Sequence, residues 1–154
     1  MSMEMYLFSD RRLDSIAAWQ QAIDATGDPL QLSTGRPFAE LNGGLPVTLR
    51  DRPTAFECNH WDAAELMAEI TSVSLDHPWR FVLAFRWGAD FDAGASAYLA
   101  AAAYAEATGG AILDCQEGRL ISPTRAREVA NEMERDGPRI MEMVRRSMEK
   151  FARE

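Results

Sequence analysis

Hydrophobic and polar positions change period along this chain, and each change marks a predicted element. Residues 4–8, EMYLF, are apolar after Glu4 and are typical of a short buried strand. Between residues 13 and 23 the apolar positions recur three and four apart, which predicts a helix that ends at Gly27. Pro29–Ser33 resembles a second strand. The first third of the chain therefore predicts a strand–helix–strand unit with a parallel crossover.

The middle of the chain predicts a hairpin, a helix and a central strand. Leu45–Arg50 and Thr54–Trp61 flank a turn-forming Asp-Arg-Pro sequence, which favours an antiparallel hairpin. A helix follows over residues 62–73. Trp79–Trp87 is the strongest strand pattern, and its centre is apolar throughout, as expected for a strand covered on both faces.

The last third begins with an alanine-rich helix from about Asp92, taken as its N-cap, to residue 108. So many small side chains predict close packing against a sheet. Residues 111–122 predict two short strands joined by a turn. Pro123 then opens a helix that runs to about residue 135, because its missing N–H is harmless in the first turn. The sequence Asp136–Pro138 predicts a break before a last helix.

Read in order, the first six main elements run β-α-β-β-α-β once the strand at Leu45 is counted as an insertion. That is the ferredoxin-like order. A further α-β-β-α-α follows it. We therefore expect a single α+β domain over residues 1–154, with one mixed sheet and helices packed on it.

Composition and charge narrow the class of protein and its partners. The chain is 47% hydrophobic and 26% charged, with no apolar run near the ~20 residues of a membrane span, which predicts a soluble, cytoplasmic protein. Its net charge is −8, and residues 1–77 hold 12 acidic against 5 basic side chains. Such a field disfavours nucleic acid and favours a basic protein as partner, although it also serves solubility alone.

The densest group of reactive side chains lies in the sequence FECNHWDAAEL, residues 56–66. Cys58 and His60 share one face of the predicted strand, whereas Asp62 is placed to cap the following helix with Glu65 three residues on. A closed zinc site needs about four ligands, and the spacing here brings no others. We therefore expect neither a metal nor a cofactor.

Two pairs of side chains keep an enzymatic alternative open, as a small hydrolase or transferase. Cys58 and His60 could form a nucleophile and its base, although a cysteine between apolar residues is more often a core residue. Asp90 and Asp92 follow the central strand, where α/β sheets often place sites.

Two further patterns concern partners. The four tryptophans, Trp19, Trp61, Trp79 and Trp87, are either core residues or include an exposed anchor for a partner. The last predicted helix carries a stripe that is either core or a dimer face, which leaves a structural or assembly role as another alternative. The stripe consists of Ile140, Met141, Val144, Met148 and Phe151.

The block AAAYAEATGGAILDCQEGRLISPTRAREVA, Ala101–Ala130, resembles the C-terminal part of small bacterial α/β proteins. Many of those are uncharacterised, and some accompany secreted polymorphic toxins as immunity proteins. The shared features are a helix end, a turn and a helix start over 30 residues. The resemblance implies a scaffold and a bacterial origin, and it carries over no functional residue.

The leading hypothesis is a non-enzymatic binding protein of the bacterial cytoplasm, an immunity-type inhibitor of a basic toxin or enzyme. Complementary charge accelerates association, and buried aromatic side chains hold the complex. We expect no catalytic residues. The predicted contact residues come from loops and edges of the acidic half: Glu40, Asp51, Glu57 and Asp76.

Overall fold

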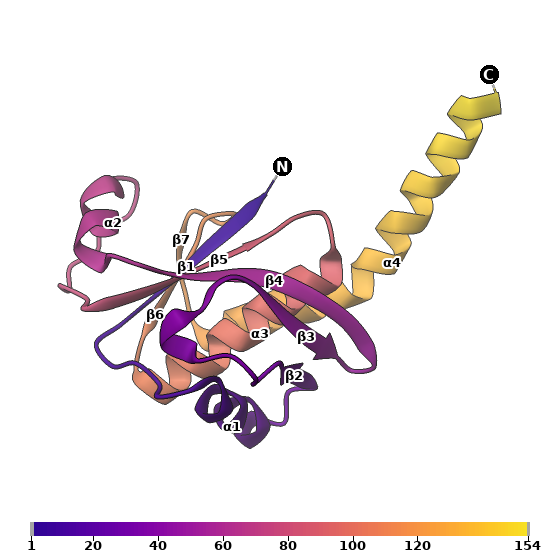
Figure 1. Ribbon diagram of the computed structural model, residues 1–154. Helices are drawn as coiled ribbons and strands as arrows, with labels where there is room; N and C mark the ends of the chain where they lie inside the picture. Colours follow the sequence, from indigo (N-terminus) through magenta and orange to yellow (C-terminus); the bar gives the residue numbers. More distant parts are fainter. Residues whose placement is uncertain (1, 154) are drawn as a thin grey trace.

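One open antiparallel sheet organises the protein in the computed structural model, which describes residues 2–153 (Figure 1). The strands are β1 (Met3–Ser9), β2 (Leu30–Leu32), β3 (Asn42–Leu49), β4 (Arg52–Trp61), β5 (Phe81–Trp87), β6 (Ala111–Asp114) and β7 (Arg119–Ile121). The helices are α1 (Ile16–Thr26), α2 (Ala63–Glu69), α3 (Phe91–Thr108) and α4 (Pro123–Arg153), with a 3₁₀ turn, η1, at Phe38–Glu40. Within the described residues, the strand order is β2-β3-β4-β5-β1-β6-β7.

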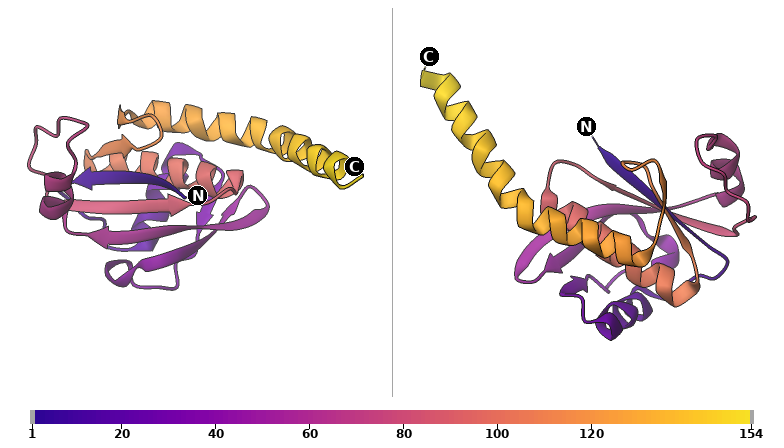
Figure 2. Two further views of the ribbon diagram at one scale, coloured as in Figure 1. Left: turned by 90° about the horizontal axis from the view of Figure 1, so that it is seen from above. Right: turned by 180° about the vertical axis from the view of Figure 1, so that it is seen from behind.

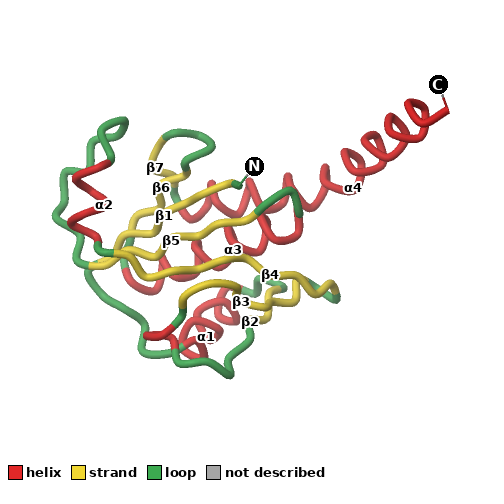
Figure 3. Tube along the Cα trace, turned by 45° about the horizontal axis from the view of Figure 1, so that its top comes forward, coloured by secondary structure: helices red, strands yellow, loops and turns green. Residues whose placement is uncertain are grey.

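The two faces of the sheet are covered unequally. Helix α3 lies along one face, with α1 on one side of it and α4 on the other (Figures 2 and 3). The main core lies between these helices and the sheet. Helix α2 and the segment after it cover part of the opposite face, where Tyr6 and Phe8 form a smaller cluster with Leu66.

The α+β class is confirmed, but the predicted mixed sheet is wrong. Every strand pair in the described part of the chain is antiparallel. Strand β1 lies between β5 and β6, with Leu7 opposite both Leu83 and Ile112. Strand β2 lies at the far edge beside β3. The predicted parallel crossover does not form, because hairpins pair locally and the long β3, β4 and β5 separate β2 from β1. The ferredoxin-like pairing is accordingly not confirmed.

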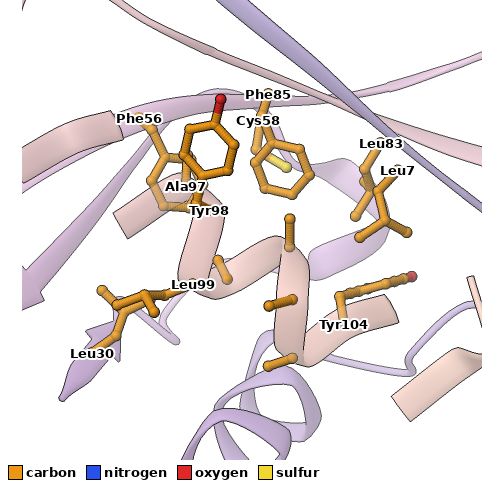
Figure 4. Close-up of a cluster of buried hydrophobic side chains, with 14 of the residues drawn as sticks. Leu7, Leu30, Phe56, Cys58, Leu83, Phe85, Ala97, Tyr98, Leu99 and Tyr104 are labelled. Carbon is orange, nitrogen blue, oxygen red and sulfur yellow. The ribbon is translucent and has the colours of Figure 1, made fainter. Parts of the chain in front are cut away.

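Helix α3 is buried on all sides, so the close packing that its alanine-rich sequence predicts against a sheet also involves neighbouring helices. Thirteen consecutive residues, from Ala93 to Ala105, are buried. Figure 4 shows Ala97, Tyr98, Leu99 and Tyr104 of this helix in the core with Phe56 and Phe85 of the sheet. At Gly94 the approach is closest, because a Cβ there would overlap the Met133 side chain and lie 2.7 Å from Trp87 Nε1. Only small side chains allow the sheet, α1 and α4 to meet around one helix.

Helix α1 is fixed to this core by two side chains. Trp19 is fully buried and donates a hydrogen bond from Nε1 to the carbonyl oxygen of Ala100 at 2.9 Å. Gln20 donates to the carbonyl oxygen of Leu30 at 2.8 Å and accepts from the backbone N–H of Leu32 at 2.6 Å. The Gln20 amide therefore satisfies backbone groups of the edge strand β2.

The predicted break at residues 136–138 is also wrong, since α4 runs through Pro138 as a single helix. Pro138 lacks an N–H donor, which is the usual cause of a kink, and the helix changes direction along its length (Figure 1). Close contact supports the helix there. A Cβ at Gly137 would lie 2.7 Å from Cβ of Phe91.

The two halves of α4 have different surroundings. In the first half, Ala126 and Ala130 are buried, and Glu134 pairs with Arg50 at 2.8 Å and Arg52 at 3.1 Å. In the second half, no residue from 138 to 152 is buried. The first half is thus part of the core, and the second half extends into solvent.

The packing of α3 predicts the effect of enlarging one alanine. Ala97→Leu adds three carbon atoms at a fully buried position, so we expect it to lower the free energy of unfolding by about 1–3 kcal/mol. Ala17→Leu, on the exposed side of α1, should change it by less than about 0.5 kcal/mol. Urea unfolding of the two variants checks this, and equal effects would show that α3 is loosely packed.

Candidate functional site

The pair Cys58 and His60 lies on the helix-covered face of β4, as the alternation of side chains predicts. Cys58 is fully buried, and burial raises the pKa of its thiol far above the usual range. His60 is half-buried, which lowers its pKa, and its Nε2 lies 2.8 Å from the carbonyl oxygen of Phe38. Because burial favours the protonated thiol and His60 is engaged with the backbone, the pair is suited to packing more than to nucleophilic chemistry.

The carboxylates of Asp90 and Asp92 both accept hydrogen bonds from neighbouring groups of the fold. Asp90 is the N-cap of α3, because the helix begins at Phe91, so the prediction of Asp92 as the cap is wrong. Asp90 accepts from Asp92 N at 2.9 Å and from the Thr54 hydroxyl at 2.6 Å. Asp92 pairs with Arg52 at 2.8 and 3.1 Å. Together they fasten the start of α3 to the β3–β4 hairpin.

A largely apolar groove separates this loop from the middle of α4. Its outer part has a volume of about 440 Å³ and is lined by Ala89, Asp90, Phe91, Asp92, Gly137, Pro138 and Met141. An adjoining part of about 240 Å³ shares Ala89, Asp90 and Phe91 and reaches Trp87 and Tyr98. The groove is open where α4 leaves the body of the protein.

Asp114 is a buried acid that the sequence pattern did not single out as a site. It ends the apolar strand β6 and is fully buried. Its Oδ1 accepts from the Tyr98 hydroxyl at 2.9 Å and from Gln116 N at 3.1 Å, whereas Oδ2 has no partner among the described residues. Burial raises the pKa of this carboxyl. The only sequence signal is an acidic residue inside an apolar run.

The four predicted contact residues do not form one patch. All four are exposed: Glu40 in η1, Asp51 in the β3–β4 turn, Glu57 within β4, and Asp76 between α2 and β5. Asp51 precedes one end of β4, and Asp76 lies toward the other end. A strand of ten residues spans about 33 Å, so one small contact area cannot include both.

The structure instead gathers acidic side chains where β4 passes into α2. Asp62 caps α2, as predicted, by accepting a hydrogen bond from Glu65 N at 2.9 Å. Glu65 and Glu69 are four residues apart, so they lie on the same side of the helix. With Trp61, Asp62 and Leu66 they line a groove of about 260 Å³.

Trp61 gives this groove an aromatic wall. Its side chain is the one tryptophan among the exposed large hydrophobic residues, with 41% of its surface accessible. The Tyr6 ring packs against the Trp61 ring, with ring centroids 5.7 Å apart. The residues that line the groove include three carboxylates and no basic side chain. Sequence reasoning missed this site because each residue already had a local role, in a strand end or a helix cap.

Within residues 2–153, no three or more histidine, cysteine, aspartate or glutamate side chains are grouped so that they could hold a metal ion. No helix in the same range combines the length and apolar character needed to cross a bilayer. The two cysteines are free thiols.

Comparisons with protein-family models, with curated proteins and with solved structures find no match. The resemblance of residues 101–130 to immunity-associated proteins therefore stays a prediction.

The different burial of the Cys58 and Cys115 thiols predicts that they react at different rates with thiol reagents. Cys115 is exposed, but partial burial with Glu4 and Asp114 nearby raises the pKa of its thiol to about 11. A disulfide-exchange reagent should therefore label Cys115 slowly, with a rate that rises about tenfold per pH unit through pH 9. Cys58 should react only after denaturation. Mass spectrometry of the labelled protein checks this, with Cys115→Ser as control; native labelling of Cys58 would contradict it.

Asp114 predicts a pH dependence of stability. Its folded-state pKa lies above its unfolded value, so the folded protein holds this proton to higher pH. The free energy of unfolding should therefore fall as pH rises from about 4 through the raised pKa. Asp114→Asn cannot titrate and should lack this fall. Urea unfolding at a series of pH values compares the two proteins, and parallel profiles would contradict the assignment.

Proposed function

We propose that this protein is a non-enzymatic binding protein that covers the active surface of a basic protein, as an immunity-type inhibitor of a toxin or enzyme does. The observation that carries the proposal is the groove in which Trp61 faces the carboxylates of Asp62, Glu65 and Glu69. It combines an aromatic anchor with concentrated negative charge at one exposed corner of the molecule.

The groove suits an arginine or lysine side chain from the partner. A guanidinium stacks on the face of an indole through the cation–π interaction, which contributes about 0.5–2 kcal/mol depending on exposure. Its N–H groups donate charge-assisted hydrogen bonds to carboxylates at the same time. Glu65 and Glu69 lie one helical turn apart and offer such acceptors along one side.

Charge and aromatic contact would have separate effects on binding. The acidic half of the chain, with 12 acidic and 5 basic side chains over residues 1–77, attracts a basic partner and raises its association rate. The Trp61 side chain loses its exposed surface in the complex and slows dissociation. An inhibitor needs both properties, because it must reach its target quickly and remain bound.

The other reactive side chains support binding more than catalysis. Cys58 is buried with a raised pKa, and Asp90 and Asp92 hold Thr54 and Arg52. Each pair has a structural role that accounts for its position. The hydrolase or transferase alternative would require one of them to be released from these contacts.

Charge removal at the groove tests the proposal. The tagged protein is used to capture partners from cells of its natural source at low and moderate salt, and a captured basic protein is then studied by binding kinetics. Glu65→Gln with Glu69→Gln should slow association about tenfold at low salt and reduce its salt dependence. Trp61→Ala should weaken binding about 30-fold, chiefly through faster dissociation.

A matched control removes the same charge elsewhere. Asp24→Asn with Asp51→Asn deletes two exposed carboxylates, one on α1 across the sheet from α2 and one in the β3–β4 turn at the other end of β4, and should leave association nearly unchanged. If the control pair slows association and the groove pair does not, the contact surface lies at the β3–β4 turn and α1, and the groove assignment is wrong. If no basic protein is captured at either salt concentration, the inhibitor proposal is wrong.

A further inference from the structure

The C-terminal half of α4 extends away from the body of the protein (Figure 1). Its apolar side chains form a stripe that is exposed to solvent. Met141, Val144, Met148 and Phe151 are 56, 47, 68 and 82% exposed, and Ile140 flanks them. Helical segments of about 12–15 residues are marginally stable in water unless an apolar face is packed. A stripe of this kind on a projecting helix therefore indicates that another surface covers it.

The spacing of the stripe is that of a coiled-coil seam. Positions 141, 144, 148 and 151 are separated by three, four and three residues, which matches two heptads of alternating a and d positions. Beside the seam, Arg145 pairs with Glu142 at 2.6 Å and with Glu149 at 2.5 Å on the same helix. A second helix can approach without burying these charges unpaired.

We propose that a second copy of this chain covers the stripe, in a two-fold symmetric pair of antiparallel α4 helices. In the register centred between Val144 and Met148, Phe151 of each copy lies opposite Met141 of the other. Met141 lines the 440 Å³ groove together with Phe91 and Pro138. Phe151, which is 82% exposed in one copy, therefore enters the 440 Å³ groove of the other, twice over in a closed dimer.

Charge favours this orientation over a parallel one. Residues 139–154 hold 5 basic and 3 acidic side chains, a net +2, whereas residues 1–138 hold 11 and 21, a net −10. A parallel pair would place two positive segments side by side. An antiparallel pair returns each positive segment to the acidic body of the other copy, near Asp90 and Asp92 at the groove. The positive residues 139–154 of one copy thus lie against the negative residues 1–138 of the other.

The buried area agrees with a dimer of moderate affinity. The eight seam side chains of two copies would bury on the order of 1,000 Å², close to the lower end of specific interfaces. Filling the two grooves adds to this area. We therefore expect a dissociation constant in the micromolar range. This inference does not depend on the proposed inhibitor role.

Sedimentation of the full chain over a micromolar concentration series tests the dimer. The wild type should pass from monomer to dimer, and Met148→Glu should raise the dissociation constant at least tenfold, because it places a charge in the seam. Met143→Glu is a matched control: Met143 is 61% exposed on the same helix but lies off the seam. Circular dichroism shows whether both variants remain folded.

Cysteine cross-linking tests the register, in a Cys115→Ser background. With Met141→Cys and Phe151→Cys together, mild oxidation should give a covalent dimer, whereas either substitution alone should give none. The two positions are about 15 Å apart on one helix, so they cannot pair within a chain. Cross-linking by either single variant would overturn the antiparallel arrangement.

Three further results would overturn the proposal. The first is a monomer at every concentration, and the second is equal loss of dimer in Met143→Glu and Met148→Glu. The third is a monomer that co-sediments with anionic lipid vesicles through the stripe, which would assign this face to a membrane surface.

Discussion

The packing of α3 against three neighbours at once is the constraint from which the rest of the structure follows. From Ala93 to Ala105 every residue is buried, so the helix has no side left for solvent. Its small side chains bring the sheet, α1 and α4 close to a single axis, and Gly94 marks the tightest point. Dispersion contacts, each weak, accumulate over this whole surface. Because this packing stabilises the core, polar side chains and irregular segments can be accommodated in other parts of the protein.

The few large side chains of α3 carry its polar contacts. Tyr98 donates to Asp114 at the end of β6, and the Tyr104 hydroxyl accepts from the backbone N–H of Leu13 at 3.2 Å. Trp19 reaches in from α1 to the Ala100 carbonyl oxygen. These hydrogen bonds fix the positions of neighbouring elements around the helix, and the same packing buries Asp114. The raised pKa of the Asp114 carboxyl is therefore a consequence of how the core is assembled.

Local features were predictable from the sequence, and long-range ones were not. Periodicity identifies the strands and most helices, and the predicted caps at Asp62 and Gly27 are confirmed, because a cap depends on adjacent residues. The pairing of β1 with β5 and β6 depends on contacts that no local pattern encodes. Pro138 was read as a break, but packing at Gly137 holds the helix together. The Trp61 groove was missed because it forms only when strand and helix meet.

The hydrogen bonds from Gln20 to β2 also affect whether a strand of another chain can add to the edge of this open sheet. An uncovered edge strand offers free N–H and C=O groups on which another chain can add a strand, the first step of many aggregates. At β2 the side-chain amide occupies two of those groups, at Leu30 and Leu32. Strand β7 at the other edge has only three residues and begins with a charged side chain, Arg119. Both edges are thus poor templates for a further strand. The open sheet is therefore protected against edge-to-edge association with other chains.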